Sequence, residues 1–197
     1  MWNQRYSEPG FAYGTEPNDF LVSSTSLLPP GSRILCLGEG EGRNAVYLAK
    51  RGHRVTAVDS SFVGLQKTQS LAEKHGVSIE TVEADLSEYI IEPNSFQSII
   101  SIFCQLPPGL RRSVHEKICS GLVPDGILVL EGFSKKQIDN DTGGPRNLEL
   151  LFDLKELKKE LEPLELTHCV EIEREVIEGN YHTGVGSVIQ IIGSKRE

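Results

Sequence analysis

A glycine-rich turn between two apolar runs constrains the fold of this chain more than any other feature. The turn, Gly38-Glu39-Gly40-Glu41-Gly42, follows the apolar run 34–37 and precedes a helix-favouring segment at 43–50. Glycines remove side chains where the backbone must turn sharply or approach a ligand closely. A second apolar run, 54–58, ends on Asp59. This order predicts a strand, a turn, a helix and a second buried strand that runs parallel to the first.

Strand and helix signals alternate along the rest of the chain. Further helices are expected at 61–75, 111–122 and 154–161, and further strands at 78–82, 96–102 and 127–130. The last two expected strands, 167–177 and 186–192, are joined by a connection too short for a crossover helix, so they must be antiparallel. The pattern predicts an α/β fold with a doubly wound, mostly parallel sheet and an antiparallel C-terminal hairpin.

Length and composition fit a single globular domain. The chain has 197 residues, of which 38% are hydrophobic and 24% are charged. We expect one domain over 1–197, with an N-terminal flap or helix region at 1–30 and a core at 31–197. The N-terminus lacks the apolar stretch of a signal peptide, and no segment has the length of a membrane-spanning helix. A cytoplasmic protein without a membrane partner is therefore expected.

Charge and cysteine spacing restrict the partners. The net charge of −8 disfavours nucleic acid, because affinity for it depends on clustered Lys and Arg side chains. A small-molecule substrate is therefore expected; a monomer is compatible with the sequence, which leaves the oligomeric state open. The cysteines form no Cys-x-x-Cys pair, which predicts buried free thiols and no metal site.

The carboxylate after the second strand indicates the class of ligand. Asp59 is placed where it can accept hydrogen bonds from ribose hydroxyls, which favours an adenosine derivative. A dinucleotide fingerprint would have a third glycine at the position of Arg43, and no Gly-Lys-Ser or Gly-Lys-Thr follows the turn, as ATP binding would need. Glu39 and Glu41 would repel a pyrophosphate but tolerate the ammonium and sulfonium groups of S-adenosylmethionine. The turn therefore favours S-adenosylmethionine as the cofactor.

These residues resemble the class I methyltransferases, whose first motif is an apolar strand followed by Gly-x-Gly-x-Gly. The resemblance implies a Rossmann-like, seven-stranded sheet and the use of S-adenosylmethionine. The segment 82–86 is similar to the third-strand motif of that family, in which the acidic side chain, here Asp85, meets the adenine amino group and the backbone, here at Leu86, meets the ring. Cys36 departs from the family, which commonly has Asp or Glu two positions before the first glycine. A thiol in an apolar strand does not replace that negative charge.

Several segments are also similar to one subgroup, the small bacterial methyltransferases of the tellurite-resistance and thiopurine types. These segments are Arg5-Tyr6, Tyr13–Asn18, Gly40–Asn44, Thr142–Pro145 and His182–Gly184. The resemblance spans nearly the whole chain and implies a small acceptor, such as a chalcogen oxyanion or a thiol. It also implies that Arg43 and Asn44 lie beside the cofactor. Asn44 opens an expected helix whose N-terminus is suited to the carboxylate of the cofactor.

The expected cofactor site combines the turn, the strand ends and an N-terminal aromatic residue. Its members are Tyr13, Gly38, Glu39, Gly40, Gly42, Asn44, Asp59, Ser60, Asp85, Leu86 and Phe103. Aromatic residues gather in the first 20 positions, where little regular structure is expected. They indicate either a flap over the sulfonium group or an N-terminal helix packed on the edge of the sheet.

The catalytic residues are left unassigned by the sequence, with three candidates. His182 could accept a proton from the acceptor, or could be a turn residue with a structural hydrogen bond. Arg146 follows Gly143 and Gly144, and the loop could bind an anion or be a solvated surface loop. Tyr13 is the preferred ligand contact of the flap, and Gln105, after the strand 96–102, could orient a substrate.

Two further functions are open at this stage. One is an NAD-dependent oxidoreductase, because the turn shares its first two glycines with the dinucleotide fingerprint. The other is a protein that binds S-adenosylmethionine as a sensor or partner subunit and transfers nothing. In-line methyl transfer needs alignment and exclusion of water more than acid–base groups, so the missing catalytic triad does not count against a methyltransferase.

Overall fold

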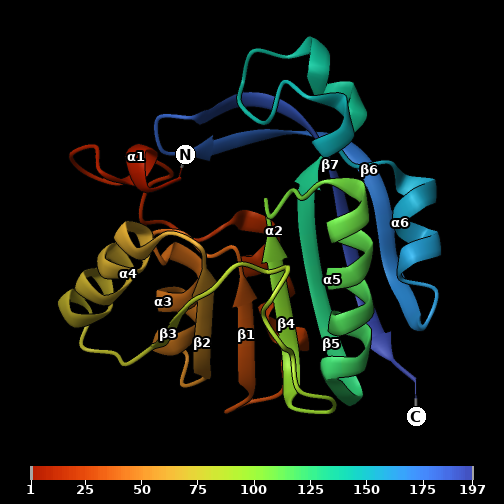
Figure 1. Cartoon of the computed structure of the whole chain (residues 1–197), viewed down its shortest axis with the longest axis horizontal. Coiled ribbons are helices and arrows are strands. Elements are labelled where there is room, and N and C mark those ends of the chain that lie inside the picture. The colour runs from red at the N-terminus through yellow and green to blue at the C-terminus, as the bar shows by residue number, and fades with distance from the viewer. Residues whose placement is uncertain (1, 197) are drawn as a thin grey trace.

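The apolar runs of the sequence form the central strands of a seven-stranded sheet with the order β3-β2-β1-β4-β5-β7-β6 (Figure 1). The computed structural model describes residues 2–196. The strands are β1 (Arg33–Leu37), β2 (Arg54–Asp59), β3 (Glu80–Glu83), β4 (Phe96–Ile102), β5 (Leu122–Phe133), β6 (Leu164–Glu178) and β7 (His182–Lys195). The helices are α1 (Trp2–Tyr6), α2 (Asp19–Ser24), α3 (Arg43–Lys50), α4 (Phe62–Lys74), α5 (Pro108–Gly121) and α6 (Leu154–Glu160). Short 3-10 helices are η1 (Thr25–Leu27), η2 (Lys135–Asp139) and η3 (Leu148–Leu150).

The strand order reverses direction at β1. This strand pairs in parallel with β2 on one side and with β4 on the other. In open α/β sheets, such a switch point opens a crevice beyond the carboxyl ends of the two strands. Because β1 ends at Leu37, the glycine-rich turn lies at this crevice.

Helices cover both faces of the sheet, and alternate residues of β1 belong to opposite cores. Leu35 packs in the core that includes residues of α5 and α6. Ile34 and Cys36 pack in the other core, with residues of α2, α3 and α4. The expected doubly wound architecture is therefore confirmed, and Cys36 is a buried core thiol.

The C-terminal hairpin is antiparallel, as expected, and longer than the sequence indicated. The pairing of β6 with β7 runs from Leu164 opposite Lys195 to Glu178 opposite His182, and β7 also pairs antiparallel with β5. His182 was expected in the connecting turn, but it is the first residue of β7. Its backbone is therefore fixed by the sheet.

Element boundaries differ from the expectation at two further places. The segment Pro124-Asp125-Gly126 was expected to precede a strand, but it lies inside β5. Asp125 has a positive φ of 61°, and the pairing of β5 with β4 shifts register between Phe96 and Ser98. Strand β5 therefore continues through this segment with a local irregularity. Helix α5 begins at Pro108 instead of residue 111, because proline suits the first turn of a helix.

The N-terminal region contains two different parts. Phe20 and Leu21 of α2 are buried in the core, so this part packs on the sheet. Helix α1 lies against α4 at the end of the sheet where β1 and β2 terminate (Figure 1). Within residues 2–196, the structure contains no helix whose length and apolar character would let it cross a membrane.

Candidate functional site

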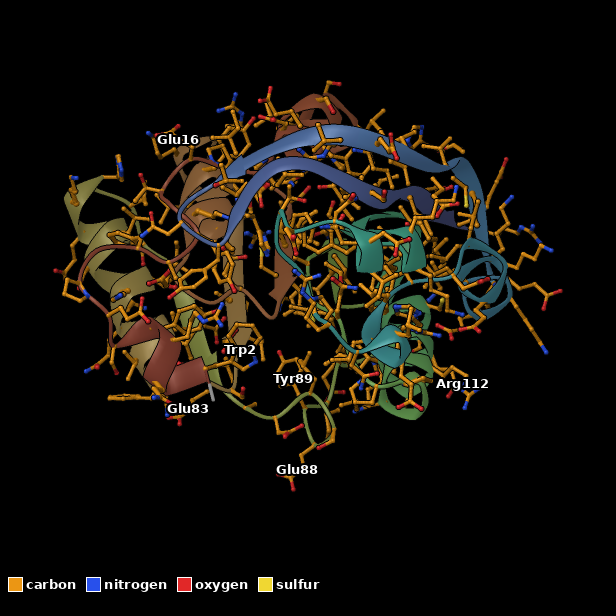
Figure 2. All side chains as sticks on the ribbon, turned by 90° about the horizontal axis from the view of Figure 1, so that it is seen from above. Trp2, Glu16, Glu83, Glu88, Tyr89 and Arg112 are labelled. Atoms are coloured by element: carbon orange, nitrogen blue, oxygen red, sulfur yellow. The ribbon has the colours of Figure 1, made fainter. Side chains whose placement is uncertain are left out.

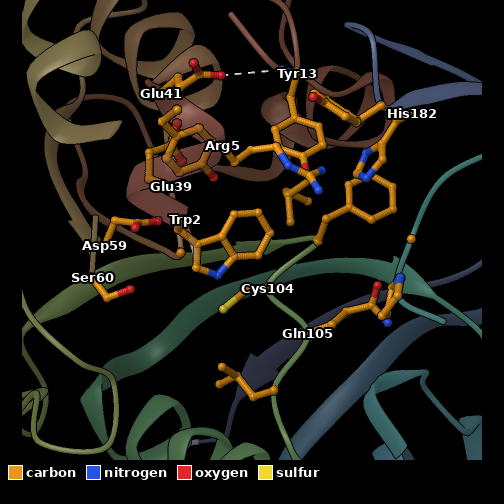
Figure 3. A pocket seen from close by; sticks show the side chains of 18 of the residues that line it. Trp2, Arg5, Tyr13, Glu39, Glu41, Asp59, Ser60, Cys104, Gln105 and His182 are labelled. Carbon is orange, nitrogen blue, oxygen red and sulfur yellow. Dashed lines mark hydrogen bonds between the residues drawn. The ribbon is translucent and has the colours of Figure 1, made fainter. Parts of the chain in front are cut away.

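A cavity of about 540 Å³ lies at the carboxyl ends of β1, β2 and β4. Figure 2 looks down on this end of the sheet, with the β6–β7 hairpin along one side and α1, which carries Trp2, along the other. Figure 3 shows Asp59 and Ser60 on one side of the cavity and Gln105 and His182 on the opposite side. The cavity therefore joins the glycine-rich turn to the C-terminal hairpin, as expected for a site at a topological switch point.

The glycines of the turn have different neighbours. Gly38 borders the cavity, and a Cβ on it would lie 2.8 Å from Sγ of Cys104. Gly40 and Gly42 were expected to contact the cofactor, but neither borders the cavity. A Cβ on Gly40 would lie 2.6 Å from the hydroxyl of Tyr6, and one on Gly42 would meet Thr68 at 2.7 Å. These two glycines are therefore required by close packing of the protein on itself.

Asp59 fixes the shape of the turn from the end of β2. Its Oδ2 accepts a hydrogen bond from the backbone N–H of Gly40 at 2.9 Å, and its Oδ1 accepts one from Ser61 at 2.7 Å. Burial raises the pKa of Asp59, although these backbone hydrogen bonds act in the opposite direction. Each carboxylate oxygen has a second lone pair, so Asp59 can still accept hydrogen bonds from a ligand in the cavity.

Glu39 occupies the N-terminus of α3. Its Oε1 accepts hydrogen bonds from the backbone N–H groups of Asn44 at 3.0 Å and Ala45 at 2.8 Å. The expectation that this helix N-terminus holds a ligand carboxylate is wrong, because a carboxylate of the protein already takes these donors. Burial raises the pKa of Glu39 to about 7. Beside it, burial and then Glu39 itself raise the pKa of the Cys36 thiol well above its usual value.

Glu41 holds the N-terminal segment against the turn. It accepts hydrogen bonds from the backbone N–H groups of Ala12 at 2.7 Å and Tyr13 at 3.4 Å, and it forms an ion pair with Lys67 at 2.8 Å (Figure 3). Its negative charge is therefore matched within the protein. Asn44 also binds this segment, because its Oδ1 accepts from the backbone N–H of Asn18 at 2.9 Å.

The residues after β3 border the same end of the cavity. Asp85 and Leu86 line it together with Ser60 and Trp2. Oδ1 of Asp85 accepts hydrogen bonds from the hydroxyl of Ser87 at 2.7 Å and from its N–H at 2.8 Å, which lowers the pKa of the carboxyl group. Within residues 2–196, Oδ2 of Asp85 has no hydrogen-bond partner. Asp85 is therefore an ionised acceptor with one oxygen available.

Arg43 connects the turn to the hairpin. Its Nη2 forms a buried ion pair with Oε2 of Glu178 at 2.7 Å. Its Nη1 is also buried, borders no acceptor among residues 2–196, and belongs to a side chain that lines the cavity. A buried guanidinium N–H without a partner is costly.

His182 and Glu178 form a buried pair at the hairpin end of the cavity. Nδ1 of His182 lies 3.4 Å from Oε2 of Glu178. Burial opposes ionisation of Glu178, but hydrogen bonds from His182, Arg43 and Asn18 outweigh it and lower its pKa to about 2. Burial lowers the pKa of His182 despite its carboxylate partner, so the imidazole is neutral near pH 7. This arrangement orients His182 and leaves Nε2 as its proton acceptor.

Aromatic rings surround His182. The ring centroids of Tyr13, Phe103 and Phe133 lie 4.6, 4.8 and 5.0 Å from that of His182. Phe103 has a positive φ of 51°, which is strained for this residue type, and it follows β4 at the edge of the cavity. Tyr13 accepts a hydrogen bond from Nη1 of Arg5 at 3.1 Å, and the guanidinium of Arg5 lies 4.0 Å from the ring centroid of Tyr181, so the N-terminal segment reaches across to the hairpin.

Two residues that were expected to contact the substrate bind other parts of the protein instead. Arg146 does not border the cavity; it forms an ion pair with Asp141 and donates to backbone carbonyls of its own loop. Gln105 lines the cavity, but its amide donates to Phe133 O at 3.0 Å and Leu150 O at 2.9 Å. Arg146 is therefore a surface residue, and Gln105 positions the chain after β5. Gly143 and Gly144 do border the cavity.

Sequence reasoning missed several residues that line the cavity or support it. They are Arg5, Tyr6, Arg43 in its pairing with Glu178, Phe133, Leu150 and Tyr181. No local signal marks Glu178, which lies in a strand with several other glutamates, and its partner Arg43 is 135 positions away. All four cysteines are free, and among residues 2–196 no three His, Cys, Asp or Glu side chains cluster as metal ligands would.

Comparison with known proteins shows similarity to methyltransferases over the first part of the chain. A family model described as a methyltransferase domain matches residues 34–126. The 2-heptyl-1-hydroxyquinolin-4(1H)-one methyltransferase of Mycobacteroides abscessus is 29% identical over 115 residues, covering 57% of this chain and 51% of that protein. A methyltransferase of Geobacillus sp. (strain WCH70) is 34% identical over 113 residues, covering 55% of this chain and 45% of that protein. The chain thus spans about half the length of these curated relatives.

A solved structure extends the similarity to nearly the whole fold. The crystal structure of TehB from Haemophilus influenzae has a TM-score of 0.73 at 21% identity, covering 90% of this chain and 62% of that one. The matched family segment runs from β1 into β5 and includes the glycine-rich turn, Asp59 and Asp85. His182 and Glu178 lie outside that segment.

Proposed function

We propose that this chain, which belongs to the class I S-adenosylmethionine-dependent methyltransferases, transfers the methyl group of that cofactor to a small-molecule acceptor. The observation that carries the proposal is the extent of one cavity. It joins the glycine-rich turn and the carboxylates after β2 and β3 to the buried pair of His182 and Glu178. A binding site for an adenosine cofactor therefore opens directly onto a group that can accept a proton.

The cavity residues fit the cofactor. Gly38 has no side chain where the backbone approaches the cavity, and Asp59 keeps lone pairs for ribose hydroxyls. Asp85 presents a free oxygen to an adenine amino group beside the backbone of Leu86. We assign to the cofactor the lining residues Tyr13, Gly38, Glu39, Asn44, Asp59, Ser60, Asp85, Leu86 and Phe103.

The chemistry assigned to the protein is alignment, exclusion of water and removal of one proton. When bound, S-adenosylmethionine supplies an electrophilic methyl group and keeps the electron pair of the broken S–C bond. His182 Nε2 accepts the proton of a hydroxyl or thiol acceptor, while Glu178 holds Nδ1 and the orientation of the ring. Tyr13, Phe103 and Phe133 surround this point and limit access of water.

We propose that the acceptor is a small molecule and that the protein binds neither nucleic acid nor a membrane. The net charge and the cavity volume agree with this proposal. The net charge of −8 opposes binding of a polyanion. A cavity of about 540 Å³ that also holds the cofactor leaves room for a small molecule. The relative from M. abscessus is named for a hydroxyquinolinone, which supports a small acceptor here. We retain a thiol or chalcogen oxyanion as the acceptor to test first, and a cytoplasmic monomer as the form in which it acts.

Two binding measurements test the cofactor, and one transfer assay tests the activity. Calorimetry should detect S-adenosylhomocysteine binding, whereas NADH should bind more weakly, because Arg43 stands where a dinucleotide site has glycine. Labelled S-adenosylmethionine should then transfer its methyl group to a member of a panel of thiols, selenite and tellurite. Absence of S-adenosylhomocysteine binding at millimolar concentration would refute the proposal. Binding without transfer to any acceptor would favour a sensor or partner subunit.

A further inference from the structure

Arg5 brings a positive charge to the hairpin end of the cavity without an acidic partner. Two arginines of the described chain line the cavity, Arg5 and Arg43, and the second is paired with Glu178. Arg5 forms no ion pair within residues 2–196. Its Nη1 donates to the hydroxyl of Tyr13 at 3.1 Å, and its guanidinium lies 4.0 Å from the ring centroid of Tyr181. This end of the cavity therefore has one cation that contacts no carboxylate of the described chain.

Arg5 and Tyr13 both keep a donor for a ligand. Nε and Nη2 of Arg5 have no hydrogen-bond partner within residues 2–196, and both nitrogens keep accessible surface. The carboxylate of Glu8 accepts from the hydroxyl of Tyr181 at 2.7 Å and not from Arg5. The hydroxyl of Tyr13 accepts from Arg5, and its own proton has no acceptor among the described residues. Burial raises the pKa of Tyr13, so the hydroxyl stays protonated near neutral pH. Arg5 and Tyr13 can therefore donate together to one anionic group.

The neighbours of Arg5 in helix α1 fix its position. Oδ1 of Asn3 accepts a hydrogen bond from the hydroxyl of Ser61, just before α4, at 2.6 Å. Tyr6 is buried, with its hydroxyl packed against Gly40 of the turn. Arg5 itself is half-buried, so its charge is partly removed from water and an opposite charge beside it gains strength. The subsite is therefore largely formed before a ligand binds.

The free donors lie next to the proposed proton acceptor. Figure 3 shows the guanidinium of Arg5 beside Tyr13 and His182. The ring centroid of Tyr13 lies 4.6 Å from that of His182, whereas its hydroxyl meets Arg5, so the two functional groups are neighbours but distinct. The lining residues from β5 and the loop after it are apolar, namely Phe133, Pro145 and Leu150. The acceptor end therefore combines a cation, a proton acceptor and apolar walls.

We propose that Arg5 and the hydroxyl of Tyr13 form an anion subsite for the acceptor, and that the acceptor is a small organic acid. Such a molecule has an apolar body, a hydroxyl or thiol that faces His182, and a separate carboxylate that pairs with Arg5. The proposal rests on the proposed function and narrows its substrate class, because a neutral acceptor would leave Arg5 unpaired. A guanidinium binds a carboxylate through two parallel hydrogen bonds, which also fixes the direction in which the nucleophile points.

Calorimetry on the protein saturated with S-adenosylhomocysteine tests the subsite. The probes are the isomeric mercaptobenzoates and the matching mercaptobenzamides, which have the same ring and thiol but no carboxylate. We expect at least one mercaptobenzoate to bind roughly 10- to 100-fold more tightly than its amide, because hydrogen bonds to charged groups are the strong ones. Arg5→Gln should abolish this preference, since glutamine can still donate to Tyr13 but carries no charge. Arg5→Lys keeps the charge without the paired donors and should retain part of it.

Arg146→Gln is the matched control. Arg146 lies in the loop after β5, does not border the cavity and is paired with Asp141. This substitution changes the net charge of the protein as much as Arg5→Gln does, but it should leave the preference for mercaptobenzoate unchanged. Equal loss of the preference in both variants would assign it to the overall charge and overturn the proposal.

Three other results would also overturn it. No mercaptobenzoate binds more tightly than its amide, or the preference persists in Arg5→Gln, or Arg5→Gln weakens S-adenosylhomocysteine to the same extent. The last result would assign Arg5 to the carboxylate of the cofactor. In each case the unmodified protein still binds S-adenosylhomocysteine, so the proposed function would stand. Failure of the unmodified protein to bind S-adenosylhomocysteine would refute the proposed function instead.

Discussion

At the glycine-rich end of the cavity, Glu39 and Asp59 are held by backbone N–H groups of the turn and its flanking elements, whereas the hairpin end is held by side chains from distant segments. Glu39 bonds to residues five and six positions away, and Asp59 bonds to a residue two positions away. At the hairpin end, Glu178 bonds to Arg43 and Asn18, which are 135 and 160 positions away. The contacts of Glu39 and Asp59 can form once β1, α3 and β2 are in place, but those of Glu178 require the complete fold.

The buried charges differ in the same way. At the turn, backbone N–H groups of nearby residues satisfy the carboxylates of Glu39 and Asp59. At the hairpin, Glu178 and the fully buried Glu131 share Asn18 and Arg174 as partners. A network of this kind fails when one member is removed, because the remaining charges are left buried without partners. The comparison therefore predicts that single substitutions at the hairpin end have the larger effects on stability.

Glu178→Ala should produce the largest effect. It leaves Arg43 without its ion pair and removes acceptors from Asn18 and His182, so we expect a loss of about 3 to 5 kcal/mol in the free energy of unfolding. Urea unfolding followed by circular dichroism measures it. Glu173→Ala, on the exposed side of the same strand, should change the free energy by less than about 0.5 kcal/mol. Similar values for the two variants would show that the network does not act as described.

His182→Gln should have the next largest effect, chiefly on rate, because the amide of Gln keeps a donor for Glu178. Loss of the proposed proton acceptor should lower kcat by roughly a hundredfold or more, while the affinity for S-adenosylhomocysteine stays the same. Because burial lowers the pKa of His182, the rate of the unmodified protein should fall only below the usual imidazole pKa. Rapid-quench measurement of methyl transfer tests both statements. An unchanged kcat would assign His182 a structural role.

The same contrast explains how much of this molecule its sequence predicts. The strands, the helices and the sheet topology follow from apolar runs and short connections, which are local signals. Asp59 and Asp85 were predictable as cavity residues because both come at the ends of strands. The roles of Gly40 and Gly42 were not, because Tyr6 and Thr68, which pack against them, come from other parts of the chain.

The partners of a charged side chain were the least predictable feature. Glu39 carries a charge that suggested a role in binding, but the sequence does not show that it also caps α3. Arg146 follows two glycines that do border the cavity, yet it turns to Asp141 within its own loop. Both outcomes depend on which acceptor or donor lies nearest after folding, and residue order alone does not determine that distance.

The pH dependence of ligand binding sharpens the description of the turn. Burial raises the pKa of Glu39 to about 7, with Arg43 and Asp59 as the charged groups near it and Cys36 and Tyr6 as neutral neighbours. We have assigned Glu39 to the cofactor, whose ammonium group would bind the ionised carboxylate, so below pH 7 binding would release a proton. The affinity for S-adenosylhomocysteine should then fall by up to about tenfold for each unit of pH, as one unit of pKa corresponds to about 1.4 kcal/mol.

Calorimetry between weakly acidic and weakly alkaline pH measures this dependence, and buffers with different ionisation enthalpies count the protons released. A second ligand, 5′-methylthioadenosine, shares the adenosine and thioether of S-adenosylhomocysteine but lacks its ammonium group. Titration of His182 would affect both ligands, so the ratio of their affinities isolates Glu39. In Glu39→Gln the ratio should be independent of pH. A ratio that varies with pH to the same extent in that variant would assign the titration to another group.

Arg146→Ala should have the smallest effect of all. Arg146 and its ion pair with Asp141 are exposed, and Arg146 does not border the cavity. Exposed ion pairs contribute about 1 kcal/mol at most to the free energy of unfolding. Methyl transfer and S-adenosylhomocysteine binding should both be unchanged, whereas Gly144→Ala, beside it, would place a Cβ 2.7 Å from the ring of Phe133 and should lower the rate. If Arg146→Ala instead raised the KM of an anionic acceptor, the loop would have to move toward the cavity during catalysis, and the hairpin end would contain a cation that its present contacts keep outside.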